Sequence, residues 1–305
     1  MKFAITTAIR LLAVTLVYFV CFVVVSGALL STTTEQPAPA DAGATLLALL
    51  VVSLVHSVVL TYVIRRSRWS GWKLIVAVFF VLYGVSTLMP QIETAYFVTR
   101  LPPGMLPRLF VAGLIVAAVF SPLAVLILGK WRSRTYDAFY DGRLKMPASS
   151  WMVRLSIVAI AYVAIYFTFG YFIAWQSEAV RVYYGGNDPG SFIAQMGNVL
   201  RTEPRLFLLQ IARGLLWTLI ALPVIKMMRG KWWEAGLAVA LLFAMGSSQL
   251  LIPNPLMPAE VRMAHLVETA TSNFLFGWLV VAVLVLKTAH AQDGRDRRPF
   301  AVRHS

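Results

Sequence analysis

Eight apolar segments, each about as long as a bilayer is thick, dominate this sequence. A helix needs about 20 mostly apolar residues to cross the ~30 Å hydrocarbon core. The segments cover residues 11–30, 45–64, 74–92, 109–129, 155–175, 206–225, 235–252 and 263–286. Prolines end the third and the seventh, Pro90 and Pro253, and the eighth is polar in its first half. We therefore predict an all-α, polytopic integral membrane protein with eight transmembrane helices.

The composition agrees with lipid as the solvent of this chain. Apolar side chains make up 59% of the 305 residues and charged ones 13%, and the mean hydropathy is +0.74. Soluble chains average roughly 45–50% apolar and about 25% charged residues. These values exclude a cytosolic enzyme, a secreted disulfide scaffold and a disordered chain. The single cysteine, Cys21, also excludes an intrachain disulfide and a zinc site built on cysteines.

The net charge of +14 follows a regular alternation along the chain. Of the 27 Lys and Arg residues, 20 fall in the two termini and in every second connection between spans. The remaining 7 share the other side with 8 of the 13 acidic residues. The positive-inside rule then predicts a protein of the cell inner membrane with both termini cytoplasmic. We expect the basic residues to contact membrane lipids, and we do not expect nucleic acid as a partner.

Three ordered matches suggest an internal repeat. Arg10 and Tyr18 recur as Arg154 and Tyr162, with a Leu and a Val also matched at the same offset of 144 residues. Weaker matches follow in the same order at the third spans and before the fourth. We predict two parallel four-helix halves related by a pseudo-twofold axis along the membrane normal. The domains are then residues 1–130, a cytoplasmic linker 131–154, a second half 155–287 with an outer loop 176–205, and a basic tail 288–305.

The outer loop itself contains a turn-forming cluster, Gly185 to Gly190. The residues on either side of this turn, 175–184 and 191–200, can each form a short helix. Apolar residues recur at helical spacing in the second of these segments. We therefore expect an amphipathic helix that lies on the outer membrane surface.

Ionisable residues inside a membrane are costly and often functional, and this chain concentrates them on its last span. Its polar residues fall within about 140° of helical arc: Arg262, His265, Glu268, Thr269, Ser272 and Asn273. Glu268 lies about 9 Å deeper than Arg262, at 1.5 Å per residue, so it should face the protein interior. We predict Glu268 and His265 as the catalytic residues.

Further polar residues sit at the same predicted depth on other spans. They suggest a polar pocket that opens to the outer side and is closed below by apolar residues. We expect Arg213 to be the ionic partner of Glu268, because both lie near the outer boundary. The predicted substrate-binding residues are Arg213, Arg262, Glu93, Asn273 and Gln210, with Gln91, Tyr96, Gln249 and Asn254 nearby.

Several functions remain open for this pocket. The leading one is binding or processing of a lipid or other membrane-embedded substrate at the outer leaflet, by hydrolysis or group transfer. The alternatives are a proton-coupled transporter or permease, and a non-catalytic subunit of a membrane complex in which the polar stripe joins helices. A metal held by His265, Glu268 and Glu93, or a haem between His56 and His265, has weaker support. The sequence indicates no particular cofactor or oligomeric state, and it lacks HExxH, GxSxG and EExxxR motifs.

Overall fold

A computed structural model describes residues 2–30, 42–98, 101–132, 142–186 and 188–296. All regular elements among these residues are helices, and eight of them are long and apolar enough to span a membrane. The spans are Ile5–Leu30, Ala42–Arg66, Gly71–Phe97, Met105–Ile127, Ala148–Ala174, Pro204–Met227, Trp232–Leu251 and Ala259–Leu286. The prediction of an all-α polytopic membrane protein with eight spans is confirmed.

Three of the spans change helix type along their length. The elements are α1 (Lys2–Leu30), α2 (Ala42–Arg66), α3 (Gly71–Tyr83), a π-helical turn η2 (Gly84–Leu88), α4 (Met89–Phe97), α5 (Met105–Ile127), α6 (Ala148–Phe169), a π-helical turn η3 (Gly170–Ala174), α7 (Glu178–Tyr183), α8 (Phe192–Thr202), α9 (Pro204–Met227), α10 (Trp232–Met245), a 3₁₀ segment η4 (Gly246–Leu251) and α11 (Ala259–Asp296). The short helices α7 and α8 confirm the two helices expected in the outer loop.

The third span does not end at Pro90, which corrects the predicted boundary. Proline has no N–H to donate to the carbonyl four residues earlier, and its ring crowds that carbonyl. The π-helical turn η2 resolves this conflict, since the Met89 N–H already bonds to the Gly84 oxygen five residues back. The Ser86 oxygen instead accepts a bond from Gln249 Nε2 at 3.0 Å. The helix therefore continues as α4 and carries Glu93 beyond the proline.

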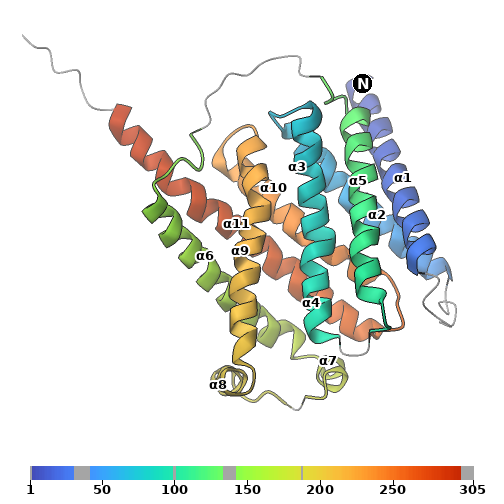
Figure 1. Cartoon of the computed structure of the whole chain (residues 1–305), viewed down its shortest axis with the longest axis vertical. Helices are drawn as coiled ribbons and strands as arrows, with labels where there is room; N and C mark the ends of the chain where they lie inside the picture. Colours follow the sequence, from blue (N-terminus) through green and yellow to red (C-terminus); the bar gives the residue numbers. More distant parts are fainter. Residues whose placement is uncertain (1, 31–41, 99–100, 133–141, 187, 297–305) are drawn as a thin grey trace, which may run out of the picture.

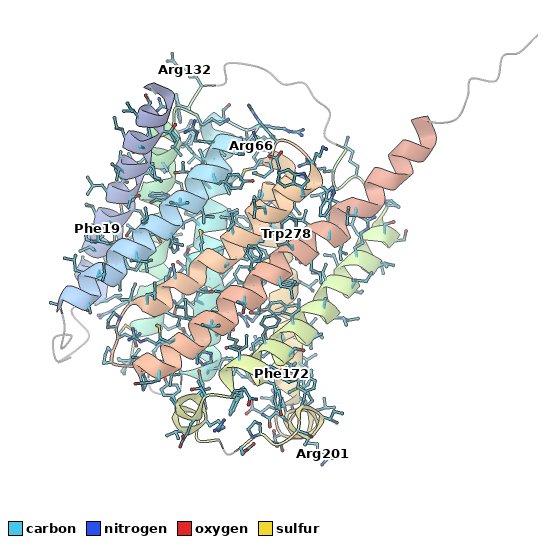
Figure 2. The ribbon with its side chains drawn as sticks, turned by 180° about the vertical axis from the view of Figure 1, so that it is seen from behind. Phe19, Arg66, Arg132, Phe172, Arg201 and Trp278 are labelled. Atoms are coloured by element: carbon cyan, nitrogen blue, oxygen red, sulfur yellow. The ribbon has the colours of Figure 1, made fainter. Side chains whose placement is uncertain are left out.

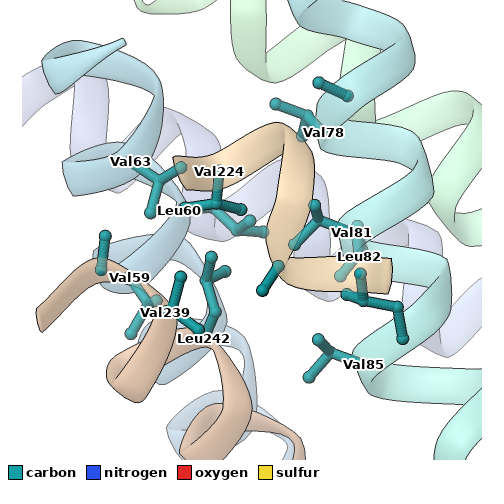
Figure 3. Close-up of a cluster of buried hydrophobic side chains, with 14 of the residues drawn as sticks. Val59, Leu60, Val63, Val78, Val81, Leu82, Val85, Val224, Val239 and Leu242 are labelled. Atoms are coloured by element: carbon teal, nitrogen blue, oxygen red, sulfur yellow. The ribbon is translucent and has the colours of Figure 1, made fainter. Parts of the chain in front are cut away.

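The spans pack as two groups around an apolar centre (Figure 1). In the first group α1 contacts α2 and α5, and α5 contacts α3; in the second α6 contacts α9 and α11, and α11 contacts α10. Across the centre α2 lies against α10, and α3 lies against α9. Figure 3 shows branched side chains from α2, α3, α9 and α10 filling this centre, among them Leu60, Val81, Val224 and Leu242, all buried.

Corresponding residues of the two groups make corresponding contacts. Arg10 Nη1 donates to the Leu128 oxygen at 3.3 Å, and Arg154 Nη1 donates to the Leu284 oxygen at 2.6 Å. Each bond ties the first helix of a group to the last one. The first helix of each group also carries a buried tyrosine with two ring-bearing neighbours. Tyr18 packs against His56 and Phe120, and Tyr162 packs against Phe276 and accepts a hydrogen bond from Trp217. The sequence match thus involves residues with the same role in packing.

Basic connections gather at one end of the bundle. Ser67, after α2, and Met228, after α9, form an isolated antiparallel bridge, and Arg143 donates to the Met228 oxygen at 3.0 Å. Figure 2 shows Arg66 and Arg132 at this end. The short helices α7 and α8 lie at the opposite end (Figure 1), where the polar residues of α4, α9 and α11 also converge.

Candidate functional site

The first part of the polar site is an ion pair between α4 and α9. Arg213 Nη1 lies 2.6 Å from Glu93 Oε1 and donates to Gln210 Oε1 at 2.8 Å. Arg213 is only 3% exposed and Gln210 is fully buried, whereas the Glu93 side chain is 31% exposed. The positive member of the pair is therefore the one removed from solvent, and it depends on Glu93 for its neutralisation.

Two tyrosines of α6 complete the surroundings of Arg213. Its guanidinium carbon lies 5.6 Å from the Tyr162 ring centroid and 6.0 Å from that of Tyr166, within the range of cation–π attraction. Gly214 allows this approach, because a Cβ atom there would lie 2.8 Å from the Tyr162 Cβ. Trp217 Nε1 in turn donates to the Tyr162 hydroxyl at 3.2 Å. The arginine is thus held by packing as well as by charge.

The second part of the site is a chain of hydrogen bonds from α7 to α11. His265 Nδ1 lies 2.7 Å from Glu268 Oε2, and the Tyr184 hydroxyl lies 3.3 Å from His265 Nε2. Burial, followed by the charges of nearby groups including Glu93 and Glu268, raises the pKa of the Tyr184 hydroxyl. This hydroxyl therefore stays protonated and donates to Nε2. A neutral His265 then carries its proton on Nδ1 and donates it to Glu268.

The two parts belong to one cluster. Tyr166 is buried within electrostatic range of Glu93, Glu268 and Arg213. The π-helical turn η3 brings its backbone close to the same place, since a Cβ on Gly170 would lie 3.4 Å from Glu268 Oε1. Glu268 is 8% exposed. We call Glu93, Gln210, Arg213, His265, Glu268, Tyr162, Tyr166 and Tyr184 the polar cluster.

The structure corrects the expected partner of Glu268. Glu268 is buried and paired, as predicted, but its partner is His265, and Arg213 pairs with Glu93. The reason lies in the third span, which continues through Pro90 and so brings Glu93 to the buried guanidinium. The prediction of Glu268 as the partner of Arg213 assumed that the third span stops at Pro90.

The remaining predicted binding residues are placed less centrally. Arg262 is buried and its Nη1 lies 3.5 Å from the Leu251 oxygen, while its Nε has no partner. Asn273 is half-buried on α11 and takes no part in the hydrogen bonds of the polar cluster. Of the neighbouring candidates, Asn254 accepts bonds from the backbone of the turn that it begins.

Three members of the polar cluster were not predicted from the sequence: Tyr162, Tyr166 and Tyr184. Tyr162 did stand out in the repeat, but only as a marker of alignment. Tyr184 belongs to the segment between α6 and α9, directly before Gly185, which has φ +69°. Nothing in the local sequence shows that this loop folds back over α11; Tyr183 fixes it there by donating to the Leu256 oxygen at 2.9 Å.

Both histidines considered as metal or haem ligands use both ring nitrogens for hydrogen bonds. The fully buried His56 contacts the Val52 oxygen at 2.9 Å and the Ser86 hydroxyl at 3.0 Å. His265 contacts Tyr184 and Glu268. Neither arrangement leaves a nitrogen for haem iron. Among the described residues no group of three His, Cys, Asp or Glu side chains is arranged to hold a metal ion, which contradicts the trio of His265, Glu268 and Glu93.

A narrow cavity of about 90 Å³ lies in the first group, between α1, α5 and the segment from α3 to α4. Its polar lining residues include Ser86, Gln91 and Gln249. The Gln91 Oε1 atom is buried without a hydrogen-bond partner. Glu93 is two positions after Gln91, about 200° around the helix, so the two lie on nearly opposite faces of α4. The helix α4 therefore stands between this cavity and the polar cluster.

Known proteins offer no guide to this arrangement, since no family model, curated protein or solved structure matches the chain. Its chemical capacity follows from its groups alone. The imidazole of His265 can accept a proton at Nε2, and Glu268 can stabilise the imidazolium that results. The guanidinium of Arg213 can hold negative charge nearby.

Proposed function

We propose that this integral membrane protein binds and processes a lipid or other membrane-embedded substrate at its polar cluster. The observation that carries this proposal is the hydrogen-bonded chain from Tyr184 through His265 to Glu268. A hydroxyl, an imidazole and a carboxylate in this order form the arrangement in which the imidazole acts as a general base. The adjacent Arg213 and Glu93 supply a charged wall within the span.

In this proposal a substrate hydroxyl or a water takes the place of the Tyr184 hydroxyl at His265. Nε2 removes its proton, and Glu268 stabilises the imidazolium through Nδ1–H. The oxygen then attacks an electrophilic centre of the substrate, and the imidazolium returns the proton to the leaving group. Tyr184 is a poor nucleophile because its raised pKa keeps it protonated, so we assign it the role of covering His265.

Unpaired donors near the cluster favour a substrate with negative charge. Buried N–H groups without a partner occur at Arg213 Nε, Gln210 Nε2 and Arg262 Nε. An unsatisfied buried donor costs about 1–3 kcal/mol, and an acceptor that bonds to it recovers part of this cost. A phosphate or carboxylate headgroup, or the oxyanion that forms during the reaction, supplies such acceptors.

The proposed location is the cell inner membrane, with both termini cytoplasmic and the polar cluster toward the outer side. The gathering of basic connections at the end that holds the Ser67–Met228 bridge supports this orientation. We also propose that spans one to four and five to eight are repeats of one unit. The equivalent bonds of Arg10 and Arg154 support this interpretation.

One observation favours a second candidate, a proton-coupled permease. The π-helical turn η2 interrupts the third span, and the fifth and seventh spans end in the irregular turns η3 and η4; broken helices surround the binding sites of many transporters. Proton exchange at His265 and Glu268 would then accompany the movement of a solute. The buried apolar centre in Figure 3 would have to open for this transport.

The test uses the full chain reconstituted in nanodiscs of phosphatidylethanolamine, phosphatidylglycerol and cardiolipin. Mass spectrometry of the lipids before and after incubation should show a modified lipid or a lipid retained by the protein. Glu268→Gln and His265→Gln should abolish the modification while the melting temperature stays near that of the wild type. Glu260→Gln is the matched control, since Glu260 is exposed at the start of the same helix.

Two results would contradict the proposed processing. The first is a wild-type protein that neither modifies nor retains any of these lipids. The second is a loss of activity in Glu268→Gln that only follows the loss of folded protein, which would assign the cluster to structure. The permease instead requires a pH change inside proteoliposomes that disappears in His265→Gln, with no lipid modified in either protein.

A further inference from the structure

An open groove on the opposite, basic end of the bundle is separate from the polar cluster. It has a volume of about 460 Å³ and is lined by Trp69, Trp72, Lys73, Val76, Ala77, Phe80 and Pro223. This volume lies within the range of ligand clefts, about 300–1,000 Å³. The small side chain of Ala77 on α3 and the proline ring on α9 leave the space between the larger side chains.

The groove faces the lipid. Trp72, Val76 and Phe80 recur at helical spacing on the third span, and they are 68%, 61% and 37% exposed. Apolar side chains exposed along a membrane span contact acyl chains. Trp72 also packs edge-on against Trp131, with 5.4 Å between ring centroids. Tryptophans at this position are typical of the boundary between hydrocarbon and headgroups.

The groove is positively charged at the end nearest Lys73. Lys73 is exposed, and its Nζ lies 4.2 Å from the Trp69 ring centroid. Lys130 follows α5 at the same end and donates to the Ser67 oxygen at 2.7 Å. Burial, and to a smaller extent the charge of Arg229, lowers the pKa of Lys130. An anion at this end of the groove would be attracted to both lysines.

At another part of this end, basic charge is already neutralised within the protein. There the carboxylate of Glu234 at the start of α10 forms an ion pair with Arg66. That surface therefore already holds an anion of the protein itself. Lys73, by contrast, has an aromatic ring as its contact, so its charge remains available to a ligand.

We propose that this groove binds an anionic phospholipid, with an acyl chain along Val76, Ala77 and Phe80 and the phosphate at Lys73. The apolar floor fits the chain, and the cation at the boundary fits the phosphate. Zwitterionic phospholipids fit the same floor but carry a compensating positive charge. The groove therefore selects by headgroup charge, and this property is independent of any chemistry at the polar cluster.

The experiment compares phosphatidylglycerol with phosphatidylcholine of the same acyl chains, bound to the purified full chain and counted by native mass spectrometry. The wild type should retain phosphatidylglycerol in preference. Lys73→Gln should reduce this preference roughly fivefold, the equivalent of about 1 kcal/mol for one basic residue near the surface. Lys73→Glu should reverse it. Lys231→Gln, an exposed lysine at the same end directly before α10, should leave it unchanged.

A second variant tests the floor of the groove. Ala77→Phe fills it and should lower the retention of both lipids, while Ile160→Phe on the exposed surface of α6 should not. Equal retention of the two lipids by the wild type would overturn the proposal. An equal effect of Lys73→Gln and Lys231→Gln would also overturn it, because the preference would then reflect overall charge. If Ala77→Phe does not fold, the two Lys73 variants still decide the outcome.

Discussion

The cavity beside α1 and α5 and the polar cluster beside α6 and α11 occupy corresponding places in the proposed repeat. Tyr18, Phe22 and Ser26 line the cavity from α1, and the same offset of 144 residues leads to Tyr162, Tyr166 and Gly170 at the cluster. For the last helix of each half, the alignment follows from Leu128 and Leu284, whose carbonyls accept the equivalent bonds of Arg10 and Arg154. This alignment of α5 with α11 relates Leu109, Ala112 and Val116 of the cavity to His265, Glu268 and Ser272.

The two halves differ in that one has apolar residues where the other has ionisable ones, so the helix packing itself does not require charge at these positions. The first half makes the same helix contacts with Leu109 and Ala112 where the second half has His265 and Glu268. Buried ion pairs seldom stabilise a protein more than apolar residues of similar volume would. The comparison therefore favours the proposed binding and processing of a substrate over a purely structural role for the polar cluster.

The largest expected change in stability comes from a substitution on the face of α4 that meets the polar cluster, and a substitution on its opposite face serves as the comparison. Glu93→Gln leaves the buried Arg213 charge without its partner. Breaking a buried ion pair in this way typically lowers the free energy of unfolding by about 3–5 kcal/mol. We expect a value near the lower end of this range, because the Gln210 oxygen and the two tyrosine rings still compensate the charge in part. Gln91→Leu, toward the cavity, removes an unpaired buried oxygen and should not lower stability. Thermal unfolding in detergent measures both variants.

A double-mutant cycle sharpens this comparison. Arg213→Gln alone leaves Glu93, which still reaches solvent, so we expect a smaller loss than for Glu93→Gln. The double variant should be less destabilised than the sum of the two single ones, since neither charge is then left alone. Additive losses would show that the ion pair does not form in the folded protein.

The sequence predicted the spans and the polar stripe of α11 because both depend on local pattern. Apolar length defines a span, and helical periodicity places His265 and Glu268 on one face. The pairing of Arg213 could not be predicted in the same way. It depends on a π-helical turn that carries the chain through Pro90 and on a side chain of α10–η4 that takes the freed carbonyl.

Tyr184 was missed for a different physical reason. It lies in the segment between α6 and α9, and its contact with His265 depends on how α7 folds back against α11. Turn-forming glycines indicate where such a loop bends but not which surface it covers. The repeat does not help either, because the match covers the spans and α7 lies between two of them. Contacts between a loop and a span remain beyond local pattern.

An intermediate effect tests the repeat itself. Arg154→Gln removes a charge-assisted bond to the Leu284 oxygen and should cost about 1.5–3 kcal/mol of unfolding free energy. Arg10→Gln removes the equivalent bond to Leu128 and should act in the same direction but less, because Arg10 is more exposed and its bond is longer. Arg201→Gln on the exposed surface of α8 should have no effect. A stabilising change at either position would contradict the equivalence.

The smallest expected effect concerns Tyr184, the part of the polar cluster that lies outside the repeat. Tyr184→Phe removes one hydrogen bond and should lower the unfolding free energy at neutral pH by about 0.5–1.5 kcal/mol. Because burial raises the pKa of this hydroxyl in the folded protein, the unfolded chain loses its proton first, near pH 10. The contribution of the hydroxyl is therefore complete below about pH 10 and is lost as the pH rises above it.

Unfolding of both proteins between pH 8 and pH 11 measures this contribution as the gap between the two curves. The gap should be constant up to about pH 10 and should then close, because only the wild type carries the titrating hydroxyl. Other tyrosines and lysines titrate in the same range, but they are common to both proteins and cancel in the difference. A gap that stays constant to pH 11 would mean that the hydroxyl is hydrated and does not cover His265. In that case His265 would be open to solvent. The polar cluster and the cavity beside α1 would then resemble each other in being accessible pockets.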